Sequence, residues 1–302
     1  MSSRHVSLPP RRRQGPARRA GLGLVGVVMG VCVLTVLVGL AAVLVLPHDD
    51  GAGEVEPAGS APAPVTLDMT GFDAEHIIDD EVFYDSAAMD GQEVADFIAR
   101  VNDGCRSGQD GTVCLASATF TSEDREPTPA CPGGYTGAQD ESAAQIVSKV
   151  ASSCGVNPQV LLVLLHKEQG LLTASGQTLT SWDYEAATGY ACPDGAACDP
   201  QWAGFFRQVY GAASQFQRYR LSPGSYQVVA GVPTQVAYSP SAGCGGAELT
   251  VRNQATAGLY DYTPYQPNEA VAWGGDGCSS WGNWNFYGYF RTFFGDPTPS
   301  TP

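Results

Sequence analysis

The side chain best suited to chemistry is Glu168, which closes a leucine-rich run in the middle of the chain. Leu161, Leu164 and Leu165 precede it by seven, four and three residues, so a helix would place all four on one face. The carboxylate would then continue an apolar stripe close to a helix C-terminus. The helix dipole and an apolar neighbourhood both favour the uncharged acid there, which suits a general acid. The alternative is an acid that points into solvent beside Lys167.

The histidines do not support a Ser–His–Asp arrangement. His5 and His48 lie outside the expected folded part, and His76 is distant in sequence from His166. The acidic residues between positions 73 and 85 lack the spacing of a calcium loop, and no Cys-x-x-Cys or His-x-His spacing indicates zinc. We therefore expect no metal site and no cofactor.

Cysteine usage indicates disulfide bonds rather than thiol chemistry. One of the nine cysteines, Cys32, lies in an apolar run near the N-terminus, and the other eight follow it. An even number of cysteines in an oxidising compartment is typical of disulfides. Eight cysteines allow 105 pairings, and proximity along the chain favours neighbour with neighbour: Cys105 with Cys114, Cys131 with Cys154, Cys192 with Cys198, and Cys244 with Cys278.

The elements that would position these residues are mostly helices. Asn157 is a typical N-cap residue and Pro158 would be the first residue of the helix that carries Glu168. Gly170 would end this helix. Asp90 and Glu93 are spaced as in a capping box. The apolar pattern predicts helices over 91–102, 141–154, 158–169, 203–220, 254–262 and 283–294, with a β-hairpin or extended excursion over 226–238.

The N-terminal region has the pattern of a membrane anchor. Residues 21–46 contain no charge, which is long enough to cross a bilayer, and six arginines precede them. The positive-inside rule then places residues 1–20 in the cytoplasm and the rest of the chain outside the cell. A cleaved signal peptide is the alternative, but its apolar region is usually shorter. Residues 47–66 are rich in proline, glycine and acids and are expected to form a disordered stalk.

Net charge excludes one class of partner. Only 10 of the 16 basic residues follow the N-terminal arginines, and all 31 acidic residues do, which gives that part a formal charge of −21. A protein that binds phosphate backbones needs the opposite sign. We therefore expect no nucleic-acid partner.

The run that ends in Glu168-Gln-Gly170 resembles the helix that carries the catalytic glutamate of lysozyme-like lytic transglycosylases. The order of the following segments is also similar: 187–190 resembles the glycine-rich turn of their substrate cleft, 205–219 the next helix, and 257–265 the segment in which transglycosylases carry "AYNAG". The resemblance covers roughly residues 140–294. Segments 133–137, 192–194, 262–268 and 275–280 also resemble an actinobacterial group of haemagglutinin-like cell-surface proteins.

The resemblance implies Glu168 as the acid that protonates a glycosidic oxygen in peptidoglycan, and Tyr190, Tyr262 and Tyr265 as substrate-binding residues. Glycosidases commonly use a second carboxylate, for which the candidates are Asp183, Glu185 and Asp194. The tract 281–294 contains eight aromatic residues, most of which are expected in the core at helical spacing. Its two tryptophans remain candidates for stacking on sugars: Trp281 and Trp284.

Together these observations predict a mainly α, disulfide-bonded, lysozyme-like domain with a small β or loop excursion, preceded by one transmembrane helix. The expected parts are a cytoplasmic tail (1–20), the membrane helix (21–46), the stalk (47–66), a loop-rich subdomain (67–135), the lysozyme-like domain (136–296) and a disordered tail (297–302). The predicted function is cleavage of peptidoglycan or another cell-wall glycan at the outer face of the cell membrane. The alternative is a non-catalytic glycan-binding or adhesin domain.

Overall fold

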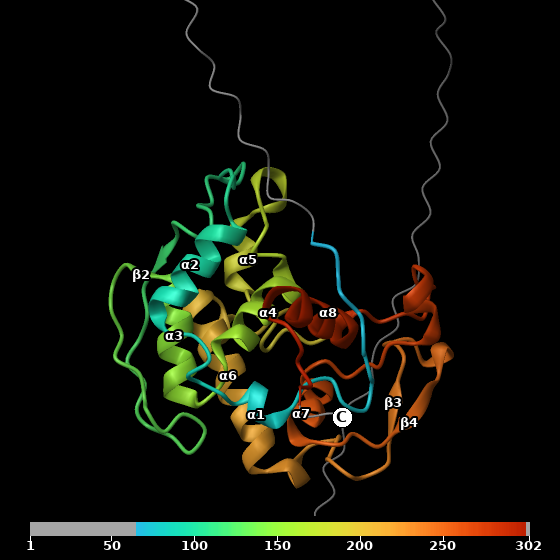
Figure 1. Cartoon of the computed structure of the whole chain (residues 1–302). Coiled ribbons are helices and arrows are strands. Elements are labelled where there is room, and N and C mark those ends of the chain that lie inside the picture. The colour runs from blue at the N-terminus through green and yellow to red at the C-terminus, as the bar shows by residue number, and fades with distance from the viewer. Residues whose placement is uncertain (1–64, 300–302) are drawn as a thin grey trace, which may run out of the picture. The chain divides into compact units, whose positions relative to one another are not determined.

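Helices surround a central apolar helix in the computed structural model, which describes residues 65–299 (Figure 1). The central helix is α4 (Pro158–Gln169), and it packs against α8 (Gly282–Phe294) and α3 (Ala143–Cys154). In turn α3 contacts α2 (Gly91–Val101) and α6 (Phe205–Leu221), and α6 contacts α7 (Gln254–Tyr262). The prediction of a mainly α domain is confirmed.

Helix α4 forms where the sequence predicted it. The Asn157 side chain accepts a hydrogen bond from the Gln159 N–H at 2.8 Å, and Pro158 occupies the first turn. Every residue from Val160 to His166 is buried, because neighbouring helices cover all sides of α4. The helix ends at Gly170, whose φ of 65° is a conformation that favours glycine.

The other predicted helices are also present, within a few residues of their expected ends. The capping box of Asp90 and Glu93 begins α2, and Ser142 with Gln145 forms a second one at α3. Two short helices were not predicted, α1 (Asp80–Phe83) and α5 (Ser181–Glu185), since neither is long enough to show helical periodicity. Short 3-10 turns connect the helices: Gly176–Thr178, Pro200–Trp202, Pro223–Ser225, Ala242–Cys244 and Glu269–Trp273.

Two small antiparallel pairs of strands complete the described part of the chain. The first joins β1 (Thr119–Phe120) to β2 (Glu141–Ser142). The second joins β3 (Thr234–Ala237) to β4 (Gly246–Leu249). The excursion expected over 226–238 is therefore strand only in its last part, because Gly231, with φ of 75°, turns the chain before β3 begins.

The four predicted disulfide bonds are confirmed. Cys105 is bonded to Cys114, and Cys192 to Cys198, so each closes a short loop. The other two bonds tie irregular segments to their neighbours: Cys131 to Cys154 at the end of α3, and Cys244 to Cys278 ahead of α8. Because the cross-linked segments have little regular structure, the disulfide bonds restrict loops that helix packing alone does not fix.

One part of the fold prediction requires correction. Within residues 65–299, no helix is long and apolar enough to cross a membrane, so the expected transmembrane helix is not found in the structure. Its residues, 21–46, lie outside the described range, as do the predicted tail 1–20 and most of the stalk.

The described residues belong to one compact unit. Side chains on both sides of position 135, such as Phe97 and Ile146, lie in the same hydrophobic core. At the edges of this unit, Thr66 accepts a hydrogen bond from Thr292 at 3.3 Å, and Pro297 accepts one from the Asp79 N–H at 2.9 Å. The predicted division into subdomains stays a prediction.

Candidate functional site

A cleft of about 720 Å³ lies at the C-terminal end of α4. It is lined by Lys167 and Glu168, by α5, by the loop at 189–198, by the end of α7 with the segment that follows it, and by the start of α8. Segments that follow Glu168 closely and segments about a hundred residues further along the chain therefore meet at this cleft. The helix that the sequence singled out ends in a cavity of the size that small-molecule and glycan sites require.

The backbone of the 187–190 turn lies directly against Glu168. A Cβ atom added at Gly189 would be 3.0 Å from Oε2 of the carboxylate, and Gly189 has a φ of +71°. Both the close approach and the backbone conformation favour glycine at this position. The turn predicted to lie in the cleft is thus the segment that borders the carboxylate.

Lys167 is buried beside Glu168. Its side chain is 4% exposed, whereas that of Glu168 is 25% exposed. The ammonium group donates to Oε1 of Glu168 and, at 3.0 Å, to the hydroxyl of Thr263. The sequence-based alternative, with Glu168 and Lys167 both in solvent, does not describe this pair. The contact also brings a positive charge that the sequence-based argument for a general acid did not include.

The two oxygens of the Glu168 carboxylate differ. Lys167 fixes Oε1, while no residue in the range 65–299 donates a hydrogen bond to Oε2. The carboxylate is therefore held in one orientation with one oxygen available. Such an arrangement suits proton transfer to or from a molecule in the cleft.

Three of the predicted substrate-binding residues line this cleft: Tyr262, Tyr265 and Trp281. The Tyr262 hydroxyl donates to the carbonyl of Thr188 at 2.9 Å, and its ring stacks on Phe216. Burial and the charge of Glu168 raise the pKa of Tyr262 well above its usual range, so it remains a neutral donor. Tyr262 thus supports the turn beside Glu168.

The other two predicted binding residues lie elsewhere. Tyr190 lines an adjoining cavity of about 520 Å³, which shares Gly189 and Tyr262 with the cleft. Trp284 packs against Phe72, with ring centroids 4.8 Å apart, and is not among the residues that line the cleft. The two tryptophans are therefore placed differently: Trp281, the N-cap residue of α8, lines the cleft, and Trp284, in the first turn of α8, packs against Phe72.

The three candidates for a second carboxylate are also separated. Only Asp194 lines the cleft, where burial and the nearby Asp194 carboxylate raise the pKa of Tyr265. Asp183 caps α5, since its carboxylate accepts from the Thr180 N–H at 2.6 Å. Glu185 lines a second cavity.

Two further residues of the cleft were not predicted from the sequence: Trp182 and Asp261. Trp182, on the short helix α5, is 57% exposed and offers an aromatic surface to the cleft. Asp261 accepts a hydrogen bond from the Val228 N–H at 2.9 Å, and its Oδ2 is buried with no partner among the described residues. Burial raises the pKa of Asp261 to about 6. Nothing in the local pattern marks Asp261, because its burial depends on the distant loop at 228.

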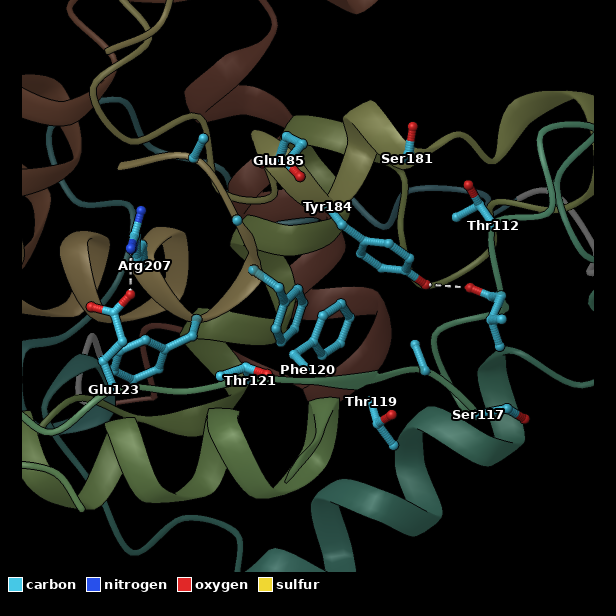
Figure 2. Close-up of a pocket in the computed structure, with 16 residues that line it drawn as sticks. Thr112, Ser117, Thr119, Phe120, Thr121, Glu123, Ser181, Tyr184, Glu185 and Arg207 are labelled. Atoms are coloured by element: carbon cyan, nitrogen blue, oxygen red, sulfur yellow. Dashed lines mark hydrogen bonds and ion pairs between the residues drawn. The ribbon is translucent and has the colours of Figure 1, made fainter. Parts of the chain in front are cut away.

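The second cavity, of about 740 Å³, lies at α5 and the start of α6 (Figure 2). Phe120 and Phe205 both line it and stack with ring centroids 4.3 Å apart. Figure 2 shows the ion pair of Glu123 with Arg207 at one end, while at the other end Tyr184 donates to a backbone carbonyl. Helix α5 contributes to both cavities, with Trp182 lining the cleft.

No group of histidine, cysteine and acidic residues in the described part of the chain has the arrangement of a metal site. Comparison with models of protein families, with curated proteins and with solved structures found no match for this chain.

Proposed function

We propose that this domain cleaves the glycan strands of peptidoglycan outside the cytoplasm, with Glu168 as the general acid. The observation that carries the proposal is the position of Glu168: its carboxylate lies in a cleft, Lys167 orients it, and Oε2 has no donor among residues 65–299. Four disulfide bonds support an oxidising compartment. The resemblance to lysozyme-like lytic transglycosylases supports the same reaction.

The lining of the cleft supports a sugar substrate. Trp182, Tyr265 and Trp281 present aromatic side chains there, and the apolar faces of sugar rings pack against such surfaces. Hydroxyl and carboxylate groups nearby, including Thr263 and Asp194, offer hydrogen bonds to sugar hydroxyls. A polymer of amino sugars satisfies both kinds of surface.

In the proposed reaction, Glu168 donates its proton to the glycosidic oxygen as the bond from this oxygen to the anomeric carbon breaks. The positive charge that develops on the sugar is quenched by attack of an oxygen nucleophile. When water attacks, the reaction is hydrolysis; when a hydroxyl of the same sugar attacks, the product is an anhydro sugar. In either case the nucleophile returns a proton to Glu168. The two products differ in mass by one water molecule.

Digestion of purified peptidoglycan tests the proposal. The wild-type protein should release soluble muropeptides, and Glu168→Gln should release almost none, because glutamine has no proton to donate. Glu248→Gln makes the same chemical change at an exposed position on β4 and should digest like the wild type.

The same assay addresses the alternative of a glycan-binding adhesin. If wild type and Glu168→Gln both sediment with cell walls and neither releases products, the enzymatic proposal is wrong and the aromatic cleft only binds glycan. If neither sediments nor digests, peptidoglycan is not the ligand of this cleft.

A further inference from the structure

Helix α6 is locally basic in an otherwise acidic chain. It carries three arginines and no acidic residue: Arg207, Arg218 and Arg220. The sequence contains no Asp or Glu between Asp199 and Glu248, although the formal charge of the whole chain is −15. Helix α6 itself therefore carries a net positive charge.

Arg218 is held in place by neutral groups alone. Its guanidinium donates to Oε1 of Gln215 at 2.6 and 2.9 Å, to the hydroxyl of Ser214 at 2.7 Å, and to the hydroxyl of Tyr190 at 2.9 Å. No carboxylate of the described residues forms an ion pair with it. The guanidinium is thus oriented while its charge has no counterion within residues 65–299.

Arg125 lies nearby with an unused donor. Its guanidinium carbon is 5.7 Å from the ring centroids of Phe206 and Tyr210, and one of its terminal nitrogens pairs with Glu123 at 2.7 Å. Its Nε is buried and has no hydrogen-bond partner among the described residues. A buried N–H without an acceptor is unfavourable, so the hydrogen bonds of Arg125 are incomplete within the described residues.

Arg125 and Arg218 line one cavity of about 550 Å³, which we term the arginine pocket. Its other walls are largely apolar and include Trp202, Tyr210 and Leu221. A ligand for this pocket must combine an anionic acceptor with an apolar body. Guanidinium groups bind carboxylates through paired N–H donors, which fits this requirement.

We propose that the arginine pocket binds the terminal carboxylate of a short peptide. A singly charged carboxylate fits better than a phosphate dianion, because Glu126 lines the pocket and Glu123 pairs with Arg125, so the excess positive charge is small. The apolar walls suit small aliphatic side chains next to the carboxylate.

Tyr190 connects the arginine pocket to the cavity that adjoins the cleft. Arg218 donates to the Tyr190 hydroxyl, Trp202 packs edge-on against the Tyr190 ring, and Tyr190 lines the cavity that shares Gly189 with the cleft. A glycan in the cleft could therefore place an attached peptide at the arginine pocket. The identification of this peptide as the stem peptide of peptidoglycan rests on the proposed function, whereas the carboxylate site does not.

Calorimetric titration of the full chain tests the site with two matched probes: an acetylated stem pentapeptide that ends in a free carboxylate and the same peptide with a C-terminal amide. The acid should bind with a dissociation constant at least about tenfold lower than the amide, as charge-assisted hydrogen bonds to arginine require. Equal binding of the two peptides, or no binding of the acid, would overturn the proposal.

Variants of α6 locate the effect. Arg218→Gln should remove the preference for the acid, whereas Arg220→Gln, which makes the same charge change beside Tyr84, should retain it. If both variants lost the preference for the acid, the preference would come from the net charge of α6 rather than from Arg218, and the proposed site would be wrong. If Arg218→Gln does not fold, the difference in binding between the acid and the amide peptide, measured on the wild-type protein, still tests the proposal.

Binding of the acid peptide by Glu168→Gln distinguishes the arginine pocket from the proposed glycan cleavage. This variant should bind the acid peptide as the wild type does, even if neither protein cleaves glycan. Cleavage without any preference for the acid would leave the proposed function in place and refute the arginine pocket.

Discussion

The described part of the chain contains two glutamate–lysine pairs that are built in opposite ways. In the pair of Glu141 and Lys149, the acid side chain is 7% exposed and the lysine 39%. In the pair of Glu168 and Lys167, the lysine is 4% exposed and the acid 25%. The first pair therefore buries its carboxylate, and the second presents its carboxylate to the cleft.

The two carboxylates also differ in their hydrogen bonds: Glu141 has more donors than Glu168. Glu141 accepts from Lys149, from the hydroxyl of Ser122 and, at 2.8 Å, from the hydroxyl of Tyr135. Burial opposes its charge, but these hydrogen bonds outweigh that cost and hold the pKa of Glu141 below its usual value. Glu168 accepts from Lys167 on one oxygen only, among the residues described. A saturated carboxylate fixes structure, whereas one with a free oxygen can exchange a proton with a ligand.

The largest expected effect on stability is at Glu141. Glu141→Gln should lower the free energy of unfolding by about 2–4 kcal/mol, because an amide oxygen that accepts from both hydroxyls leaves the amide NH2 group facing the Lys149 ammonium. Urea unfolding followed by circular dichroism measures this loss. A stability equal to that of the wild type would mean that the buried pair does not hold β2 to its surroundings.

The lysines should also differ in their effects. Lys167→Met should slow glycan cleavage by about tenfold, since the Glu168 carboxylate loses the contact that orients it. Lys149→Met should leave cleavage unchanged but cost about 1–3 kcal/mol of stability, because it removes the cation paired with the buried carboxylate of Glu141. Rates of muropeptide release per folded molecule compare the two variants. Equal rates would remove the positioning role of Lys167.

The smallest expected effect on stability comes from a third carboxylate, Asp261. Its contribution to the free energy of unfolding should change with pH in the direction opposite to that of Glu141. Its pKa of about 6 lies above the ordinary value of 3.8, so the folded state binds a proton more tightly than the unfolded state. Stability from this group is therefore present below about pH 4 and is lost as the pH rises through 6. For Glu141 the lowered pKa has the reverse effect, because stability is lost as the pH falls below its ordinary value of 4.5.

Asp261→Asn separates these contributions. The variant should lose less stability than the wild type between pH 4.5 and 6.5 (about two units around the transition), as measured by urea unfolding at each pH. Asp276→Asn is the matched control, since Asp276 is solvent-accessible and its pKa is lowered rather than raised. An unchanged pH dependence in Asp261→Asn would show that the buried Oδ2 is hydrated in solution.

Sequence patterns predicted the helices well because their signals are local. The Asn157 cap, Gly170 and the leucines between them define α4 within one stretch of chain. The disulfide pairing was also accessible, because each bond joins cysteines that are neighbours in sequence. Short elements such as α5 have no period to detect, so Trp182 could not be placed.

Features of the site that depend on tertiary contacts could not be predicted. The Lys167 ammonium is buried by Thr263 and its neighbours, which follow almost a hundred residues later. The burial of Asp261 likewise depends on the loop at Val228. Glu141 had no sequence signal at all, since two hydroxyls from separate segments complete its hydrogen bonds.

The central claim is that Glu168 is the acid that does chemistry and Glu141 the acid that holds structure. The most direct measurement is the rate of muropeptide release by wild type, Glu168→Gln and Glu141→Gln, each divided by its folded fraction. Glu168→Gln should be slower by roughly 10²- to 10⁴-fold, the usual contribution of a general acid, and Glu141→Gln should match the wild type. If Glu168→Gln released muropeptides at the wild-type rate, the claim would be contradicted.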